Sequence, residues 1–360
     1  MSSLKLPGSV GLQLTENCNL RCHMCYFWGD SGIYSIEKAQ PKVLDLNILK
    51  DLIDYLSPRK PFYSFFGGEP LLYPHLEELI RYIKKNNSIV DTPTNGTLLA
   101  KNAKILVETK FNSVRVSIDG SKEINDAQRG KGSYEKAIKG INTLHLEKKK
   151  VEAKFPYIRI LFTLTPLNYH NIEQFLLNDI NLNAIDSVSV QIENYLTEEM
   201  GLTYSKFLKE KLSISSEKYW RGFLRDPKYF KEIDTIQVAH QIENIKKRFR
   251  ELDIGLNLLP PTYTPKNLSA YFSANWNEMT DKYANCSVPW YACEITANGD
   301  VAPCHIFYDL VVGNLYEQQF DEIWNNNKYR IFRDYMKEHK LMSICPGCCI
   351  LYLQKPVNLK

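Results

Sequence analysis

The sequence lacks a long hydrophobic run. Crossing a membrane takes about 18 or more consecutive apolar residues, and the 360-residue chain contains no such stretch. Its most apolar segment, residues 157–167, includes Arg159 and has the length of a buried strand. The first ten residues carry a single lysine and no apolar run typical of a signal peptide. We therefore expect a cytoplasmic protein with no membrane partner.

A strong charge imbalance is also missing. The chain has 45 Lys and Arg against 41 Asp and Glu, a net charge of +4. Its basic clusters, at 148–150 and 246–248, are flanked by acidic and apolar residues and do not form an arm, so we expect no nucleic-acid partner. Hydrophobic residues make up 44% and charged residues 24%, which excludes a disordered chain, and the length allows more than one domain.

Cysteine is absent from residues 26–285. Three of the nine cysteines lie between positions 18 and 25, and the other six lie between 286 and 349. In a reducing compartment, clustered thiols are more typical of metal ligands than of disulfides. The distribution therefore predicts two separate sulfur sites.

The first group, Cys18, Cys22 and Cys25, has the spacing C-x3-C-x2-C. A structural zinc site takes four protein ligands, and the nearest candidate for a fourth, His23, lies between two of the cysteines. Three thiolates suit a 4Fe-4S cluster that keeps one iron open for a small molecule. A distorted zinc site is the alternative.

This spacing resembles the defining loop of the radical SAM enzymes. The loop follows an apolar alternating segment, residues 10–14, that reads as a strand, so it lies where barrel enzymes carry their chemistry. The resemblance implies a 4Fe-4S cluster that binds S-adenosylmethionine (SAM), and it puts Met24 beside the adenine. An aromatic residue is common at that position in the family, so Met24 is a departure.

Apolar runs then alternate with helical periodicity, which predicts a parallel sheet with crossover helices. The expected strands are 62–66, 88–93, 113–118, 157–165 and 187–192, and the expected helices are 74–85, 99–108, 134–149 and 171–177. We predict an α/β fold with a partial (β/α)6 TIM-like barrel, the architecture that the resemblance also implies.

A second motif, Gly67-Gly68-Glu69-Pro70, follows an apolar strand. Glycines allow a ligand to approach the backbone, and Pro70 disfavours a helical conformation at Glu69. By itself this is equally consistent with a solvated loop acid. The resemblance implies that the motif binds SAM and that Glu69 takes the methionyl ammonium group.

Weaker signals follow the third and fourth strands. The resemblance implies a ribose contact for Ser117 and a contact between Arg129 and the methionyl carboxylate, for which a guanidinium is well shaped. Each is also a common turn or surface residue. Asn95, in an Asn-Gly pair, is a further candidate for the same pocket.

The C-terminal cysteines are arranged around an Asn298-Gly299 hairpin signal, which would fold Cys304 back toward Cys286. By spacing alone, a zinc ribbon is an alternative. The segment resembles the SPASM or twitch extension of radical SAM enzymes, a small α+β domain that holds auxiliary 4Fe-4S clusters. The resemblance implies one auxiliary cluster bound by Cys286, Cys304, Cys345 and Cys348, with Cys293 or Cys349 as substitutes.

The expected domains are a radical SAM core at 1–193, a helical insertion and linker at 194–285 that is a candidate substrate cap, and the auxiliary cluster domain at 286–360. The resemblance implies reductive cleavage of SAM to a 5′-deoxyadenosyl radical, with a flavodoxin or ferredoxin as reductant. That radical would abstract hydrogen from a substrate, with a net oxidation assisted by the auxiliary cluster.

We expect a small-molecule substrate because the cysteine loop begins at residue 18, with no room before it for a leader-peptide-binding domain. Modification of a peptide or protein side chain is the alternative. His305 occupies the position of an Asp base in sulfatase-maturing relatives, so we expect it to act as a base or donor. A metal-binding scaffold without catalysis is a third interpretation, which Glu69 and the open cluster disfavour.

Overall fold

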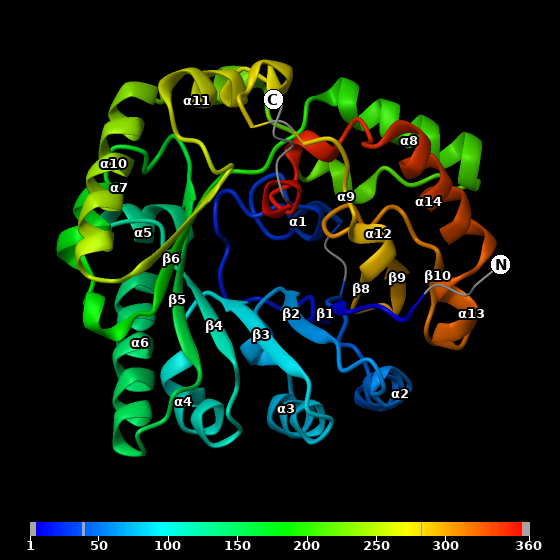
Figure 1. Cartoon of the computed structure of the whole chain (residues 1–360), viewed down its shortest axis with the longest axis horizontal. Coiled ribbons are helices and arrows are strands. Elements are labelled where there is room, and N and C mark those ends of the chain that lie inside the picture. The colour runs from blue at the N-terminus through cyan, green and yellow to red at the C-terminus, as the bar shows by residue number, and fades with distance from the viewer. Residues whose placement is uncertain (1–4, 38–39, 282, 355–360) are drawn as a thin grey trace.

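Parallel strands with crossover helices dominate the computed structural model, which describes residues 5–37, 40–281 and 283–354. Within those residues the strands form one sheet in the order β10-β9-β8-β1-β2-β3-β4-β5-β6-β7. The strands are β1 (Ser9–Thr15), β2 (Phe62–Gly67), β3 (Ile89–Thr94), β4 (Ser113–Ser117), β5 (Tyr157–Leu164), β6 (Ser187–Ile192), β7 (Gly255–Leu259), β8 (Ala292–Ile295), β9 (Asp300–Ala302) and β10 (Gly313–Asn314). The sheet curves into an arc (Figure 1). The predicted α/β class with a partial barrel is confirmed, and in the described residues the barrel does not close because β7 and β10 are the two edges.

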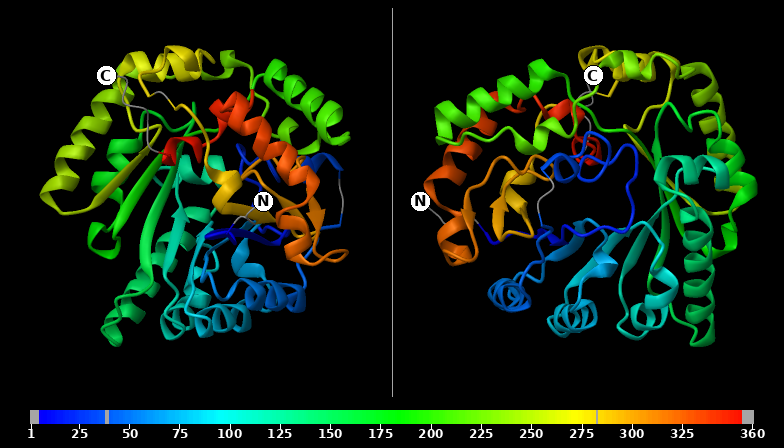
Figure 2. Two further views of the ribbon diagram at one scale, coloured as in Figure 1. Left: turned by 45° about the vertical axis from the view of Figure 1, so that its right-hand side comes forward. Right: turned by 180° about the vertical axis from the view of Figure 1, so that it is seen from behind.

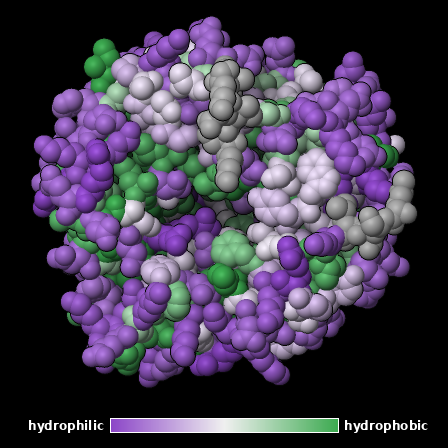
Figure 3. All heavy atoms as spheres, viewed as in Figure 1, coloured by the Kyte–Doolittle hydropathy of each residue, from purple (hydrophilic) through white to green (hydrophobic). Residues whose placement is uncertain are grey.

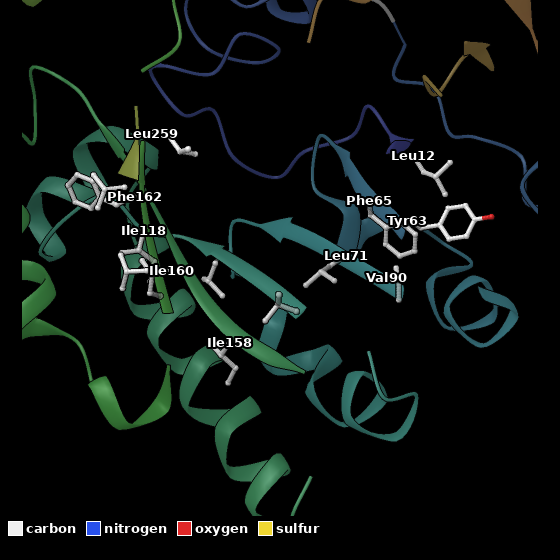
Figure 4. Packing of buried hydrophobic residues seen from close by; sticks show 14 of the residues in the cluster. Leu12, Tyr63, Phe65, Leu71, Val90, Ile118, Ile158, Ile160, Phe162 and Leu259 are labelled. Carbon is white, nitrogen blue, oxygen red and sulfur yellow. The ribbon is translucent and has the colours of Figure 1, made fainter. Parts of the chain in front are cut away.

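Helices cover the convex face of the sheet (Figure 1, Figure 2). The helices are α1 (Ile33–Glu37), α2 (Leu46–Leu56), α3 (Leu76–Lys85), α4 (Leu99–Glu108), α5 (Lys122–Arg129), α6 (Ser133–Lys150), α7 (Ile172–Gln174), α8 (Glu198–Leu212), α9 (Lys218–Arg221), α10 (Thr235–Glu251), α11 (Pro265–Phe272), α12 (Val288–Tyr291), α13 (Phe320–Trp324) and α14 (Asn327–His339). Strand residues such as Val90, Ile158 and Ile160 are fully buried in the hydrophobic core (Figure 4). None of the helices in the described part of the chain has the length and apolar content needed to cross a membrane.

Strand β7 is an element that the sequence analysis missed. It lies within 194–285, where we expected helices and a linker, and it pairs in parallel with β6 from Ser187↔Gly255 to Gln191↔Leu259. Its sequence, GLNLL, contains Gly and Asn, both of which are depleted in strands, so the local signal is weak. β7 therefore extends the predicted parallel sheet by one strand beyond β6.

Three aromatic residues of 194–285, the segment that we expect to be a candidate cap, are core residues. Trp220, Tyr263 and Tyr271 are at most 3% exposed. Trp220 packs with residues of α8 and α14 in a second hydrophobic cluster, separate from the main core. These side chains stabilise the segment and are not free to contact a ligand.

The C-terminal segment joins the sheet beside the strand that carries the first cysteine loop. β8 pairs in parallel with β1, from Ser9↔Ala292 to Leu12↔Ile295, and β9 returns antiparallel to β8. The predicted hairpin is confirmed: the N–H of Gly299 donates to the carbonyl of Thr296 at 2.9 Å, and Gly299 has φ +81°. This turn leads the chain back to Cys304.

Candidate active site

The first cysteine loop begins after β1, as predicted. The N–H of Cys25 donates to the carbonyl of Cys22 at 3.0 Å, and the N–H of Trp28 donates to Sγ of Cys25 at 3.3 Å. The imidazole of His23 turns away and lies 2.9 Å from Asp30, with both side chains largely exposed. The loop therefore presents three thiols, all partly buried, and no histidine beside them.

The Gly-Gly-Glu-Pro motif is hydrogen-bonded to the start of this loop. The N–H of Gly68 donates to the carbonyl of Thr15 at 2.9 Å, and that of Glu69 donates to the carbonyl of Asn17 at 2.7 Å. A Cβ atom on Gly68 would lie 2.0 Å from the Asn17 oxygen, so only glycine allows this approach. The two motifs, about 50 residues apart in the sequence, form one structural unit.

Glu69 is 1% exposed, and its backbone is extended, as the following proline predicts. Its carboxylate accepts hydrogen bonds from Leu71 N (3.1 Å), Thr94 Oγ1 (2.7 Å) and Asn95 N (2.8 Å). Burial raises the pKa of Glu69, and these three donors act in the opposite direction. No cationic side chain of the described residues forms a salt bridge with Glu69, so its carboxylate has no protein counter-ion among them.

Asn95 lies at the same place, in agreement with the suggestion from the sequence. Its Nδ2 is 4.0 Å from Sγ of Cys18 and donates to Asn19 Oδ1 at 2.9 Å. Since its backbone N–H also holds Glu69, Asn95 links the cysteine loop to the Gly-Gly-Glu-Pro motif.

Arg129 is beside the loop as well, at the end of α5, a helix that the sequence analysis read only as a turn. Its Nη1 lies 4.0 Å from Sγ of Cys22, and its Nε lies 2.5 Å from Oδ2 of Asp119. Burial raises the pKa of Cys22 to about 12, and the Arg129 charge opposes that rise. The guanidinium is thus held by a buried carboxylate that we had not singled out.

The two other predicted cofactor contacts, Ser117 and Met24, lie in different elements. Ser117 is the last residue of β4 and is partly buried. Met24 lies in the loop itself, and its carbonyl accepts from Nη2 of Arg225 at 3.5 Å.

Arg225 and Glu193 were missed by the sequence analysis. Nε of Arg225 donates to Oε1 of Glu193 at 2.9 Å, and Nη1 donates to Ser31 Oγ at 3.3 Å. The side chain of Glu193 is 3% exposed. Its position directly after the predicted strand β6 was the one signal in the sequence that could have identified it. Through this pair the segment 194–285 is attached to the cysteine loop.

The second group of cysteines surrounds one pocket. Cys286, Cys304, Cys345 and Cys348 all line it, together with Phe307 and His305. Cys293 is buried in β8, and neither it nor Cys349 lines the pocket. The cysteines that line the pocket are therefore the four that we predicted as ligands. Burial raises the pKa of Cys304 to about 12.

His305 borders this pocket and is held by a buried acid. Its Nδ1 lies 2.5 Å from Oε1 of Glu294, whose side chain is 7% exposed. Burial raises the pKa of Glu294, and the imidazole opposes that shift. The sequence analysis predicted His305 but not its partner.

Both cysteine groups have the donor set of an iron-sulfur cluster, because thiolates are the usual protein ligands of such clusters. In the described ranges, no group of three or more Cys, His, Asp or Glu side chains has the geometry to hold a metal ion.

Comparisons with known proteins agree with this chemistry. The radical SAM superfamily model matches residues 12–177, and the SPASM model, described as an iron-sulfur cluster-binding domain, matches residues 286–349. These two matches imply the SAM-binding 4Fe-4S cluster, an auxiliary cluster and SAM as cofactors.

Relatives and solved structures point the same way. The mycofactocin maturase MftC of Mycobacterium tuberculosis is 31% identical over 175 residues, which are 48% of this chain and 41% of MftC. The chain thus matches less than half the length of that relative. A cysteine-type anaerobic sulfatase-maturating enzyme of Clostridium novyi is 23% identical across 93% of this chain and 83% of its own. The crystal structure of Streptococcus suis SuiB bound to SAM shares the fold, with a TM-score of 0.64 at 17% identity, covering 97% of this chain and 74% of SuiB. Residues 12–177 therefore form a radical SAM domain, and residues 286–349 form a C-terminal SPASM domain.

Proposed function

We propose that this chain is a radical SAM enzyme that abstracts a hydrogen atom from a substrate bound inside the open barrel. The observation that carries the proposal is the meeting of Cys18, Cys22 and Cys25 with the buried, cation-free carboxylate of Glu69. When bound, the cluster supplies the electron that breaks a carbon–sulfur bond of SAM and releases the 5′-deoxyadenosyl radical.

Each residue around the loop has a proposed binding task. Glu69 receives the methionyl ammonium group. Its buried carboxylate accepts hydrogen bonds from three neutral donors, and a cationic donor would add a charge-assisted hydrogen bond. Arg129 binds the methionyl carboxylate, and Asp119 fixes its orientation. Gly67 and Gly68 give the ligand access to the backbone.

Ser117 and Met24 complete the proposed SAM site. The Ser117 hydroxyl contacts the ribose, and the Met24 side chain contacts the adenine. Ser117 ends β4 and Met24 lies in the loop that follows β1, and the carboxyl ends of parallel strands are where ligands of barrel enzymes bind.

We propose Cys286, Cys304, Cys345 and Cys348 as the ligands of the auxiliary cluster, since they line one pocket. Cys293 and Cys349 then stay as free thiols. A cluster bound there would supply an acceptor for the unpaired electron of the substrate radical, and His305, held by Glu294, would take or give a proton at the substrate.

The proposed substrate is a small molecule. Full-length relatives named as a pre-heme d1 synthase and an AdoMet-dependent heme synthase align over 93% and 95% of this chain, at 24% identity each. Peptide modification is the second candidate, favoured by the similarity to maturases.

We retain the division at 1–193, 194–285 and 286–360, and the contacts of Arg225 with the loop support a capping role for the middle segment.

The deciding experiment is anaerobic reconstitution with iron and sulfide, reduction by dithionite and assay of 5′-deoxyadenosine. The wild-type protein should form the nucleoside and Cys22→Ala should not. No 5′-deoxyadenosine from iron-replete wild-type protein would contradict the proposal and leave a metal-binding scaffold. Replacing dithionite with flavodoxin or ferredoxin then tests the proposed reductant.

A further inference from the structure

The concave face of the sheet is unusually polar for a barrel interior. Closed TIM barrels are filled by bulky aliphatic side chains. Here the alternate positions that face away from the helices include Ser64, Asp91, Arg115, Arg159 and Ser189. The space-filling view, in the orientation of Figure 1, shows a hollow near its centre, between β5–β6 and α12 (Figure 3). The chain therefore leaves a polar space on this face.

Two arginines stand side by side on this face. Arg115 of β4 and Arg159 of β5 are register partners in adjacent parallel strands. Their sequence neighbours Val114, Val116, Ile158 and Ile160 are fully buried on the opposite face, so strand alternation directs both arginines to the concave side. Like charges at directly opposed positions of neighbouring strands are unfavourable.

Only one carboxylate forms a salt bridge with this pair among the described residues. Asp91 lies 3.1 Å from Nε of Arg115 and 3.2 Å from its Nη2, which also donates to Ser64 Oγ at 3.0 Å. Arg159 has no salt bridge in that part of the chain, and its guanidinium is only 5.8 Å from the centre of the Tyr157 ring. The β4–β5 wall thus carries one positive charge without a counter-ion.

The opposite wall, at β8, carries an acidic side chain. Glu294 of β8 is buried, and its Oε1 lies 2.5 Å from Nδ1 of His305; burial raises the pKa of Glu294, and the charges of His305 and Arg115 oppose that rise. His305 in turn borders the pocket lined by the four auxiliary cysteines.

We propose that Arg159, assisted by Arg115, binds a carboxylate of the substrate and thereby holds the substrate with its other end toward the two cysteine groups. This inference rests on the proposed function and specifies its substrate class: a molecule with at least one free carboxylate. A guanidinium suits this task because it offers a planar pair of donors.

The test uses matched probes with the anaerobically reconstituted protein in the presence of SAM. Three pairs differ only in carboxylate charge: glutarate and glutaramide; iron coproporphyrin III and its tetramethyl ester; and a blocked Gly-Glu-Gly peptide and its Gln counterpart. Binding is measured by calorimetry or by the porphyrin absorption band. We expect the charged member of at least one pair to bind about tenfold more tightly, and the pair with the largest difference identifies the source of the carboxylate.

Three variants decide whether Arg159 is responsible. Arg159→Gln should abolish the preference for the charged probe, whereas Arg330→Gln, an exposed arginine on α14, should retain it. Asp91→Asn frees Arg115 and should tighten binding of the charged probe about threefold, an effect that a disturbed fold would not produce. Iron content and melting temperature check that each variant folds.

Two results would overturn the inference: no preference for any charged probe in the wild-type protein, or an unchanged preference in Arg159→Gln. Formation of 5′-deoxyadenosine is measured in the same samples. Wild-type protein that forms the nucleoside but shows no preference refutes the carboxylate site alone. Preference without nucleoside formation refutes the proposed function and leaves the binding site standing.

Discussion

Nε of Arg129 lies 2.5 Å from Oδ2 of Asp119, and both side chains are buried. Asp119 also accepts hydrogen bonds from Gln128 Nε2 at 2.7 Å and from the Thr163 N–H at 2.8 Å. One carboxylate therefore joins α5, β5 and the guanidinium beside Cys22.

We expect Asp119→Asn to lower the free energy of unfolding by about 3 kcal/mol, because it leaves a buried guanidinium without a counter-charge. Urea denaturation of the iron-replete protein under nitrogen measures this. Asp334→Asn, which breaks an exposed pair with Lys337, is the control and should change the stability by less than about 0.5 kcal/mol. Equal effects of the two substitutions would contradict the role of Asp119.

Iron content should separate the two cysteine groups. With two 4Fe-4S clusters the wild-type protein holds about eight irons, and Cys22→Ala and Cys304→Ala should each retain about four. Cys293→Ala is the matched control: this cysteine is buried in β8 outside the pocket, so we expect about eight irons. Loss of four irons in Cys293→Ala would show that the proposed ligand set is wrong.

Glu69→Gln should weaken SAM binding at least tenfold while the iron content stays at about eight. Glutamine keeps the shape of the side chain but removes the negative charge that attracts the ammonium group. Anaerobic equilibrium dialysis with labelled SAM measures the Kd. Glu78→Gln, at an exposed position of α3, serves as control, and an unchanged Kd in Glu69→Gln would exclude the proposed contact.

Gly201→Ala should destabilise the segment 194–285, although alanine favours helix formation. A Cβ atom at this position of α8 would lie 2.1 Å from the Trp220 ring, which is fully buried. We expect a loss of about 1–3 kcal/mol in the free energy of unfolding. Thr203→Ala, exposed on the same helix, should instead be neutral or slightly stabilising. A stable Gly201→Ala protein would mean that Trp220 can move aside freely.

Sequence patterns were informative wherever function or folding depends on neighbours in the chain. The spacing of Cys18, Cys22 and Cys25 indicated a cluster loop, Pro70 predicted the extended backbone of Glu69, and Asn298-Gly299 predicted the hairpin. Apolar runs that alternate with helical periodicity also located most of the parallel strands, because residues such as Val114, Val116 and Ile158 are buried in the core.

The missed features depend on residues far apart in the chain. Asp119 pairs with Arg129, Glu193 with Arg225 and Glu294 with His305, and each acid became recognisable only when the fold brought its partner near. Strand β7 was missed for a related reason. Its Gly and Asn have low strand propensity, and its place in the sheet comes from pairing with β6.

The parallel pairing of β8 with β1 has a mechanical consequence. β1 ends in the first cysteine loop, and β8 opens the hairpin that leads to Cys304, so backbone hydrogen bonds fix the spacing of the two cysteine groups. An outward movement of the C-terminal segment would break the backbone hydrogen bonds between β8 and β1, the strand that precedes the first cysteine loop. We therefore expect a substrate to enter and leave without separation of β8 from β1.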